Sequence, residues 1–288
     1  MRVLDSAKPY PVKGLYRLSD FPEPPPRNYI RPHIDGIDEL YSVVPGTLSV
    51  WTGYAGQGKT SFMMTLLANV MRQGHHVCMA SFETAVKPIL ARKLRAALLR
   101  APEFKSDFDP WADDLMERHL SVIAQTTDDE DMEFDLDTIL ELAKTSVRRD
   151  GCRVLVIDPW NEIEHKRRPQ ESETDYTGRA IRALKSFARL HDVAVIVVAH
   201  PAKPDMTQKL KSPGLYHISG SANWANKADY GLTIHAVQPD PKAWVIEVKI
   251  TKVRMGLPGE RGEVELYADW RTSGYVKREI NPPVETAA

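Results

Sequence analysis

Cysteine is scarce in this sequence: among 288 residues there are two, Cys78 and Cys152. Their spacing matches no metal-binding motif, and both lie in apolar runs that resemble strands. These features argue against a fold held together by disulfides. They predict two buried, reduced thiols in a protein of a reducing compartment.

Long hydrophobic runs are also missing. No apolar stretch approaches the ~18 residues that a membrane span needs. The first residues, MRVLDSAKPYPVKG, lack the apolar core of a secretory signal. We therefore expect a cytoplasmic protein with no membrane partner.

An excess of charge of one sign is the third absence. The 38 Lys and Arg residues nearly balance the 39 Asp and Glu residues, for a net charge of −1. Because proteins that bind nucleic acid are usually basic overall, such a function would need a local basic surface. The ordinary contents of hydrophobic (42%) and charged (27%) residues indicate a globular chain.

Alternating strand-like and helix-like segments follow a proline-rich start. We predict an N-terminal arm or linker over 1–35, one domain over 36–280 and a tail over 281–288. Within the domain, strands are expected at 48–52, 76–82, 153–158 and 193–200, with helices at 59–72, 86–100, 136–149 and 172–190. The segments 230–236, 244–251 and 262–268 look like a meander. The pattern predicts an α/β fold with a mainly parallel central sheet flanked by helices and antiparallel C-terminal strands.

The stretch GYAGQGKTSF, residues 53–62, stands between a predicted strand and a predicted helix. Gly53, Gly58, Lys59 and Thr60 fit the phosphate-binding pattern G-x-x-x-x-G-K-[ST]. Glycines let backbone N–H groups wrap a phosphate, the lysine meets the β and γ phosphates, and the threonine can ligate Mg²⁺. We therefore predict a site for ATP or another NTP with Mg²⁺, bound by Gly53, Gly56, Gly58, Lys59, Thr60 and Ser61.

Three further polar residues end predicted strands. Asp158 follows RVLVI and can hold Mg²⁺, although an aspartate there can also cap a helix. Glu83 follows the strand after the glycine-rich loop and can polarise an attacking water, or it can be a surface glutamate. His200 ends VIVVAH and can touch a γ-phosphate, or it can simply close the strand. Ligands gather at the carboxyl ends of parallel strands, so all three are candidates.

Six segments in order, GYAGQGKT, SFE, VLVIDPWNEIEH, VVAHPAKPD, ISGSANWANKAD and ITKVR, resemble a known family. They are similar to the RecA-like motor domain of hexameric replicative helicases of the DnaB and Twinkle type, nearest to the helicase halves of phage and plasmid primase-helicases. The resemblance covers about residues 33–270.

The resemblance implies a role for each matching residue. Glu83 corresponds to the glutamate that activates water, His200 to the γ-phosphate sensor and Asp158 to the Mg²⁺ aspartate. Arg254 corresponds to an arginine finger that enters the neighbouring subunit's site, with Lys252 beside it at the nucleotide. The candidate DNA contacts are Lys203, Lys209 and Lys211 in the channel loop, and Lys166, Arg167 and Arg168 after the aspartate, all of which are also what solvent-exposed loops carry.

The implied function is an ATP-dependent replicative DNA helicase: a ring ATPase that moves on single-stranded DNA and unwinds duplex. The implied partners are single-stranded DNA, further copies in a hexameric ring, and a primase domain or protein, in the cytoplasm of a bacterium or a phage-infected host. The chain fits both a stand-alone helicase and a fragment of a primase-helicase. Two alternatives stay open: a RecA/KaiC-like ATPase, and a nucleotide-binding assembly or loader protein that does not unwind.

Overall fold

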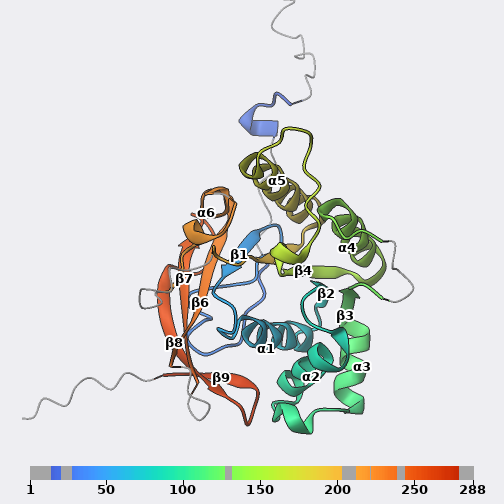
Figure 1. The fold of residues 1–288 in the computed structure, drawn as a ribbon, viewed down its shortest axis with the longest axis vertical. Helices are drawn as coiled ribbons and strands as arrows, with labels where there is room; N and C mark the ends of the chain where they lie inside the picture. The colour runs from blue at the N-terminus through green and yellow to red at the C-terminus, as the bar shows by residue number, and fades with distance from the viewer. Residues whose placement is uncertain are drawn as a thin grey trace, which may run out of the picture.

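The computed structural model describes residues 14–20, 28–126, 132–202, 212–220, 222–238 and 244–278. One mixed sheet organises these residues (Figure 1). Its strands are β1 (Leu48–Thr52), β2 (His76–Ser81), β3 (Leu120–Ile123), β4 (Cys152–Asp158), β5 (Ala194–Val198), β6 (Tyr230–Gln238), β7 (Val245–Val253), β8 (Gly262–Asp269) and β9 (Gly274–Lys277).

The strand order is β3-β2-β4-β5-β1-β6-β7-β8-β9. The first six strands of that order are parallel, and β6 to β9 pair antiparallel. This confirms the predicted α/β class, with a mainly parallel sheet and an antiparallel C-terminal extension. Because β1, β2, β4 and β5 are parallel, their carboxyl ends meet at one edge of the sheet.

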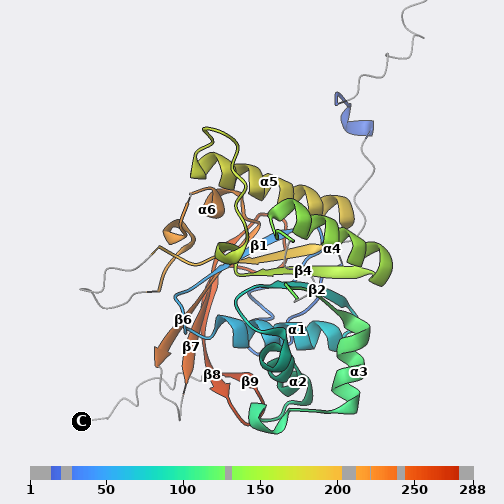
Figure 2. The same ribbon diagram turned by 45° about the vertical axis from the view of Figure 1, so that its right-hand side comes forward.

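Helices cover both faces of the sheet (Figures 1 and 2). One face is covered by α1 (Lys59–Arg72), α2 (Ala91–Leu99) and α3 (Pro110–His119), and the other by α4 (Leu136–Asp150), α5 (Glu173–His191) and α6 (Asn223–Lys227). Successive strand residues point to opposite faces. Trp51 is therefore buried in the α1 core, whereas the adjacent Val50 is buried in the α5 core.

Local signals explain where the long helices begin. The side chain of Asp135 accepts a hydrogen bond from Thr138 N at the start of α4, and Ser172 accepts one from Asp175 N at the start of α5. Short polar side chains at this position satisfy backbone N–H groups that the helix leaves free. The two cysteines are buried and unpaired, as the sequence predicted.

The predicted helix over 86–100 is wrong in its first part. Lys87 is extended, with φ −119° and ψ 135°, and the regular helix begins at Ala91. The cause is Pro88, because a residue before proline is pushed out of the α region. The short elements α3, β3, α6 and β9 were not predicted from the sequence.

The last residues of the predicted arm contact the core of the domain. Ile30 and Ile34 are buried in the α1 core, and Ile30 forms a bridge with Val43. The limits of arm, domain and tail stay predictions, because residues 1–13 and 279–288 lie outside the described chain. No helix in the described ranges is both long and apolar enough to span a membrane.

Candidate active site

The glycine-rich loop joins β1 to α1 at the carboxyl edge of the sheet. Gly53, Gly56 and Gly58 have φ values of 155°, 72° and 89°, which residues other than glycine rarely adopt. A Cβ atom on Gly53 would lie 2.2 Å from the carbonyl oxygen of Ile234 on β6. The loop is therefore restricted to glycine there by both conformation and contact, and it leads directly into the first N–H groups of α1, where anions bind favourably.

Lys59, the first residue of α1, points back across this loop. Its Nζ donates hydrogen bonds to the carbonyl oxygens of Gly53 and Tyr54, each at 2.8 Å. Burial lowers the pKa of Lys59, and the nearby carboxylates of Asp158 and Glu83 oppose that decrease. The ammonium group is thus largely desolvated and held at the loop, where a phosphate would be a stronger partner than neutral carbonyls.

Asp158 ends β4 and is 7% exposed. Burial raises its pKa to about 6; Lys59 lowers the pKa in opposition, and Glu83 adds to the increase. Thr60 lines the same cavity, so a hydroxyl and a carboxylate are available there. An all-oxygen donor pair beside a phosphate-binding loop suits Mg²⁺, which keeps several waters and takes few protein ligands. The described residues contain no group of three or more His, Cys, Asp or Glu side chains placed to hold a metal.

Glu83 and His200 face each other at the same edge. Glu83 Oε2 lies 4.0 Å from His200 Nε2, and the Glu83 side chain is 57% exposed. Burial, followed by the charge of Lys59, lowers the pKa of His200 and so favours the neutral ring, whereas Glu83 and Glu162 oppose that decrease. The backbone N of His200 donates to Asn161 Oδ1 at 2.8 Å, which fixes the end of β5 relative to the segment after β4.

A cavity of about 580 Å³ brings these residues together. Eight predicted residues line it, and they come from four separate parts of the chain: Gly56, Gly58, Lys59, Thr60, Ser61, Glu83, Asp158 and His200. The strand-end residues that the sequence singled out therefore surround one space, although the assignment of catalytic roles to them stays a prediction.

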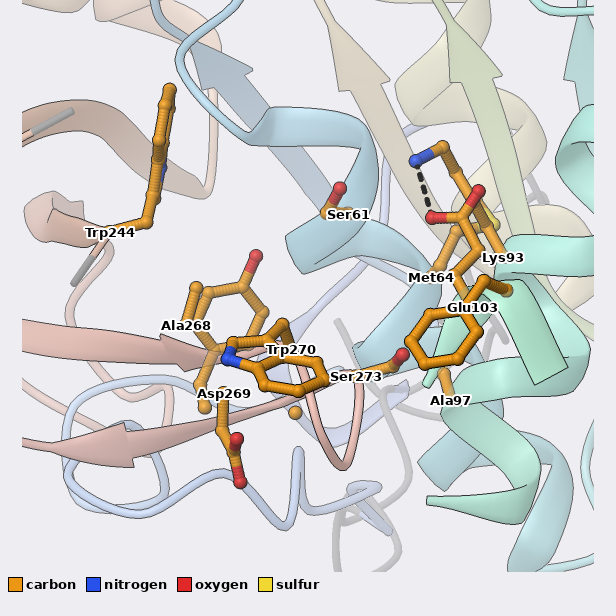
Figure 3. Close-up of a pocket in the computed structure, with 13 residues that line it drawn as sticks. Ser61, Met64, Lys93, Ala97, Glu103, Trp244, Ala268, Asp269, Trp270 and Ser273 are labelled. Carbon is orange, nitrogen blue, oxygen red and sulfur yellow. Dashed lines mark hydrogen bonds and ion pairs between the residues drawn. The ribbon is translucent and has the colours of Figure 1, made fainter. Parts of the chain in front are cut away.

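A second pocket of about 260 Å³ adjoins this cavity (Figure 3). The two share Ser61, Lys93, Trp244, Ala268 and Tyr275. Trp270 lies in this pocket with its ring centre 6.4 Å from that of Phe104, and the two residues are 56% and 64% exposed. Across the pocket, Lys93 and Glu103 form an ion pair of 3.1 Å. The pocket is thus a partly aromatic extension of the phosphate-binding cavity.

Arg254 and Lys252 lie away from the cavity, at the opposite edge of the sheet. Arg254 follows β7, whose last residue, Val253, pairs with Tyr230 at the start of β6, and Tyr230 pairs with Ser49 near the start of β1. The glycine-rich loop follows the other end of β1, which is ~13 Å long at ~3.3 Å per residue. The described residues that line the phosphate-binding cavity of the same chain include neither Arg254 nor Lys252.

Arg254 has a structural partner in its own chain. Its Nε donates to Asp229 Oδ1 at 2.6 Å, and its side chain is 47% exposed. Asp229 lies 25 positions earlier, and no motif links the two residues.

The candidate DNA contacts are divided. Lys166, Arg167 and Arg168 are exposed, and Lys166 forms ion pairs with Glu133 and Asp135. Those pairs occupy the Lys166 ammonium group in the isolated chain. Lys203, Lys209 and Lys211 lie outside the described residues.

Sequence reasoning missed several residues that shape the site. Gln57 accepts a hydrogen bond from Ala236 N at 2.7 Å and so ties the glycine-rich loop to β6. Asn161 positions the backbone of His200, and Trp270 forms a wall of the second pocket. Gln57 and Asn161 lie inside quoted motifs, so their position was a usable signal, whereas Trp270 carried none.

Comparisons with known proteins agree with this geometry. A family model described as an AAA domain matches residues 15–206. The chain is 32% identical to the Twinkle homolog protein, chloroplastic/mitochondrial, of Arabidopsis thaliana. The alignment spans 308 residues and covers 97% of this chain and 42% of that protein.

Two solved structures share the fold. A DnaB-like replicative helicase, described with its interactions with primase, has a TM-score of 0.71 at 18% identity and covers 87% of this chain and 62% of that chain. A second structure, described as an ATPase domain, has a TM-score of 0.63 at 20% identity, over 81% of this chain and 85% of that one. The chain spans less than half of the plant relative and about three fifths of the DnaB-like helicase.

Proposed function

The chain belongs to the AAA domain family, and from that premise we propose that it is the ATP-driven motor domain of a replicative DNA helicase of the DnaB and Twinkle type. The carrying observation is that Lys59, Thr60, Glu83, Asp158 and His200 line one cavity, whereas Arg254 lies at the opposite edge of the sheet. The relatives' names supply the direction of the proposal, and the residues of this chain supply its mechanism.

Hydrolysis of ATP follows from the arrangement of side chains. The loop N–H groups and Lys59 bind the β and γ phosphates, and Lys59 gives up its contacts with Gly53 O and Tyr54 O to do so. Glu83 accepts a proton from the water that attacks the γ-phosphate. His200, whose neutral ring is favoured by burial, donates a hydrogen bond near the transferred group. Mg²⁺, when held by Thr60 and Asp158, would neutralise charge on the phosphate oxygens.

The second pocket is the place we propose for the base of the nucleotide. It continues the phosphate cavity past Ser61, and Trp270 and Phe104 offer exposed ring faces. Stacking of a base on an aromatic side chain is worth ~1–3 kcal/mol and tolerates different bases. This supports ATP without excluding another NTP.

A shared active site follows from the distance between Arg254 and the phosphate-binding loop. The cation cannot reach its own chain's nucleotide across the length of β1, so we propose that it serves the nucleotide of an adjacent copy. A ring of copies, six in the DnaB and Twinkle type, would meet this need, and its channel would gather the lysine loops on single-stranded DNA. Binding of a primase and a cytoplasmic location are further parts of the proposal.

The test combines turnover with mixing of variants. We expect ATP hydrolysis that single-stranded DNA stimulates, unwinding of a forked duplex, and no hydrolysis by a folded Lys59→Ala protein. Arg254→Ala should bind ATP and lose turnover by about 10³-fold. Mixing the two inactive variants should restore part of the DNA-independent ATPase activity, because some interfaces then join an intact loop to an intact arginine.

Other outcomes would contradict specific parts. Wild-type hydrolysis by Lys59→Ala would refute the nucleotide site. Full activity of Arg254→Ala as a monomer would refute the shared site. ATP binding without DNA-stimulated turnover would favour an assembly or loader protein, and an open filament on DNA would favour a RecA-like ATPase.

A further inference from the structure

Asp229 is a buried carboxylate with two cationic partners. It lies between α6 and β6 and is 4% exposed. Its Oδ1 accepts from Lys185 Nζ on α5 and from Arg254 Nε, each at 2.6 Å, and its Oδ2 accepts from Leu48 N at 3.0 Å. One carboxylate therefore holds two positive charges, of which Arg254 is the proposed finger.

Lys185 and Arg254 also bind the carboxyl end of α6, together with Lys252. Lys185 Nζ donates to Lys227 O at 2.8 Å, and an Arg254 guanidinium nitrogen donates to the same oxygen at 3.3 Å. Lys252 Nζ donates to Ala225 O at 2.6 Å and to Asn226 O at 2.9 Å. Carbonyl groups at the end of a helix lack helical partners and carry partial negative charge. Arg254 and Lys252, the two cations that the resemblance assigns to a nucleotide site, are thus held by their own chain.

The two partners of Asp229 differ in burial. The Lys185 side chain is 13% exposed, whereas that of Arg254 is 47% exposed. A half-exposed ion pair contributes little net stability, and a buried one is costly to break because it leaves an unpaired charge. If Arg254 moves away, Lys185 and Leu48 N still compensate Asp229. Arg254 can therefore leave without uncovering a buried charge.

We propose that Asp229 and Lys185 are positioning residues for the finger: Asp229 holds Arg254 in the free subunit, and Lys185 keeps that hold weak enough for release to a neighbouring subunit's nucleotide. This rests on the proposed function, in which Arg254 acts on the adjacent site. Lys185 is not among the residues that line the phosphate-binding cavity, and its charge then controls turnover through Arg254.

Lys185→Gln tests the proposal, because glutamine removes the charge and keeps an N–H donor. Arg254 becomes the sole cation on a buried carboxylate and leaves it less readily. We expect kcat for ATP to fall about tenfold, the weight of one charge-assisted hydrogen bond, with KM unchanged. The double variant Lys185→Gln/Asp229→Asn has no charge left to hold the finger, so its kcat should recover towards wild type.

Matched variants separate charge from packing. Arg182→Gln removes a charge from an exposed position of the same helix and should leave kcat unchanged. Lys185→Arg keeps the charge and should not lower kcat, which provides a folded variant even if Lys185→Gln is unstable. Mass measurements with a non-hydrolysable ATP analogue check that every variant assembles.

Several results would overturn the proposal. One is a Lys185→Gln kcat equal to that of Arg182→Gln, another is a double variant slower than the single, and a third is a tenfold loss in Lys185→Arg. The Arg254→Ala variant distinguishes the two levels. If it loses turnover while the Lys185 variants do not differ, only the positioning role fails; if it keeps full turnover, the finger and the positioning role fail together.

Discussion

Replacing Asp158 with asparagine should make the free protein more stable and its site inactive. Burial raises the Asp158 pKa from 3.8 to about 6, even with Lys59 nearby. Such an increase corresponds to about 3 kcal/mol of cost for the ionised carboxylate in the folded state. Asparagine has nearly the same shape and no charge, so Asp158→Asn should raise the free energy of unfolding at pH 7 by an amount of that order.

The pH dependence gives this prediction its sign. Between about pH 4 and pH 6 the folded state holds a proton on Asp158 that the unfolded state has lost, so wild-type stability falls as pH rises through this window. The advantage of Asp158→Asn should therefore be absent below about pH 4, grow up to about pH 6 and stay constant above it. Denaturant unfolding without metal or nucleotide, at half-unit steps of pH, measures the curve.

Asp150 offers a control of opposite sign. Its pKa is lowered to about 2, chiefly by Arg149 and then by Ser121, despite partial burial. Asp150→Asn should thus reduce stability at pH 7 and lose that effect as the solution is acidified. If Asp158→Asn is instead less stable than wild type at pH 7 to 8, the carboxylate is satisfied in the free protein, and the argument from burial is wrong.

The remaining predictions concern turnover and binding. Glu83→Gln should bind ATP and hydrolyse it ~10²–10⁴-fold more slowly in a steady-state assay, because it removes the proposed base, whereas replacement of the exposed Glu117 with glutamine should leave turnover unchanged. A loss of less than a few-fold would reject Glu83 as the base. Replacing Lys203, Lys209 and Lys211 with alanine should flatten the salt dependence of single-stranded DNA binding by up to ~0.7 per lost contact in the log–log slope, and an unchanged slope would assign these lysines to solvent. Trp270→Ala should raise the KM for ATP about tenfold with kcat preserved, and an unaltered KM would place the base elsewhere.

The residues at the phosphate cavity were predictable because the topology of a parallel sheet determines where the strand ends lie. A strand that ends in a polar residue delivers that residue to the carboxyl edge whenever the strands are parallel. Glu83, Asp158 and His200 needed only the strand pattern to be grouped with the glycine-rich loop. The register of β2, β4 and β5 then brought them to one cavity.

The residues that were missed depend on contacts without a local signal. Asp229 meets Lys185 across 44 positions and Arg254 across 25, and nothing in either neighbourhood specifies the pairing. Trp270 gains its place only when β8 and β9 pair. The error at Lys87 was avoidable, because Pro88 was visible in the sequence and the residue before proline resists the α conformation.

The two edges of the sheet differ in how well their charges are satisfied. At the phosphate cavity, burial lowers the pKa of Lys59 and raises that of Asp158, so their charged forms carry a desolvation cost that bound phosphate and Mg²⁺ would offset. At the other edge, Arg254 already has a carboxylate and a carbonyl as partners. A neighbouring copy alone therefore offers Arg254 little that it lacks, whereas a neighbouring copy with its nucleotide offers a concentrated negative charge. Under the proposed function, nucleotide must therefore bind to the neighbouring copy before Arg254 leaves Asp229.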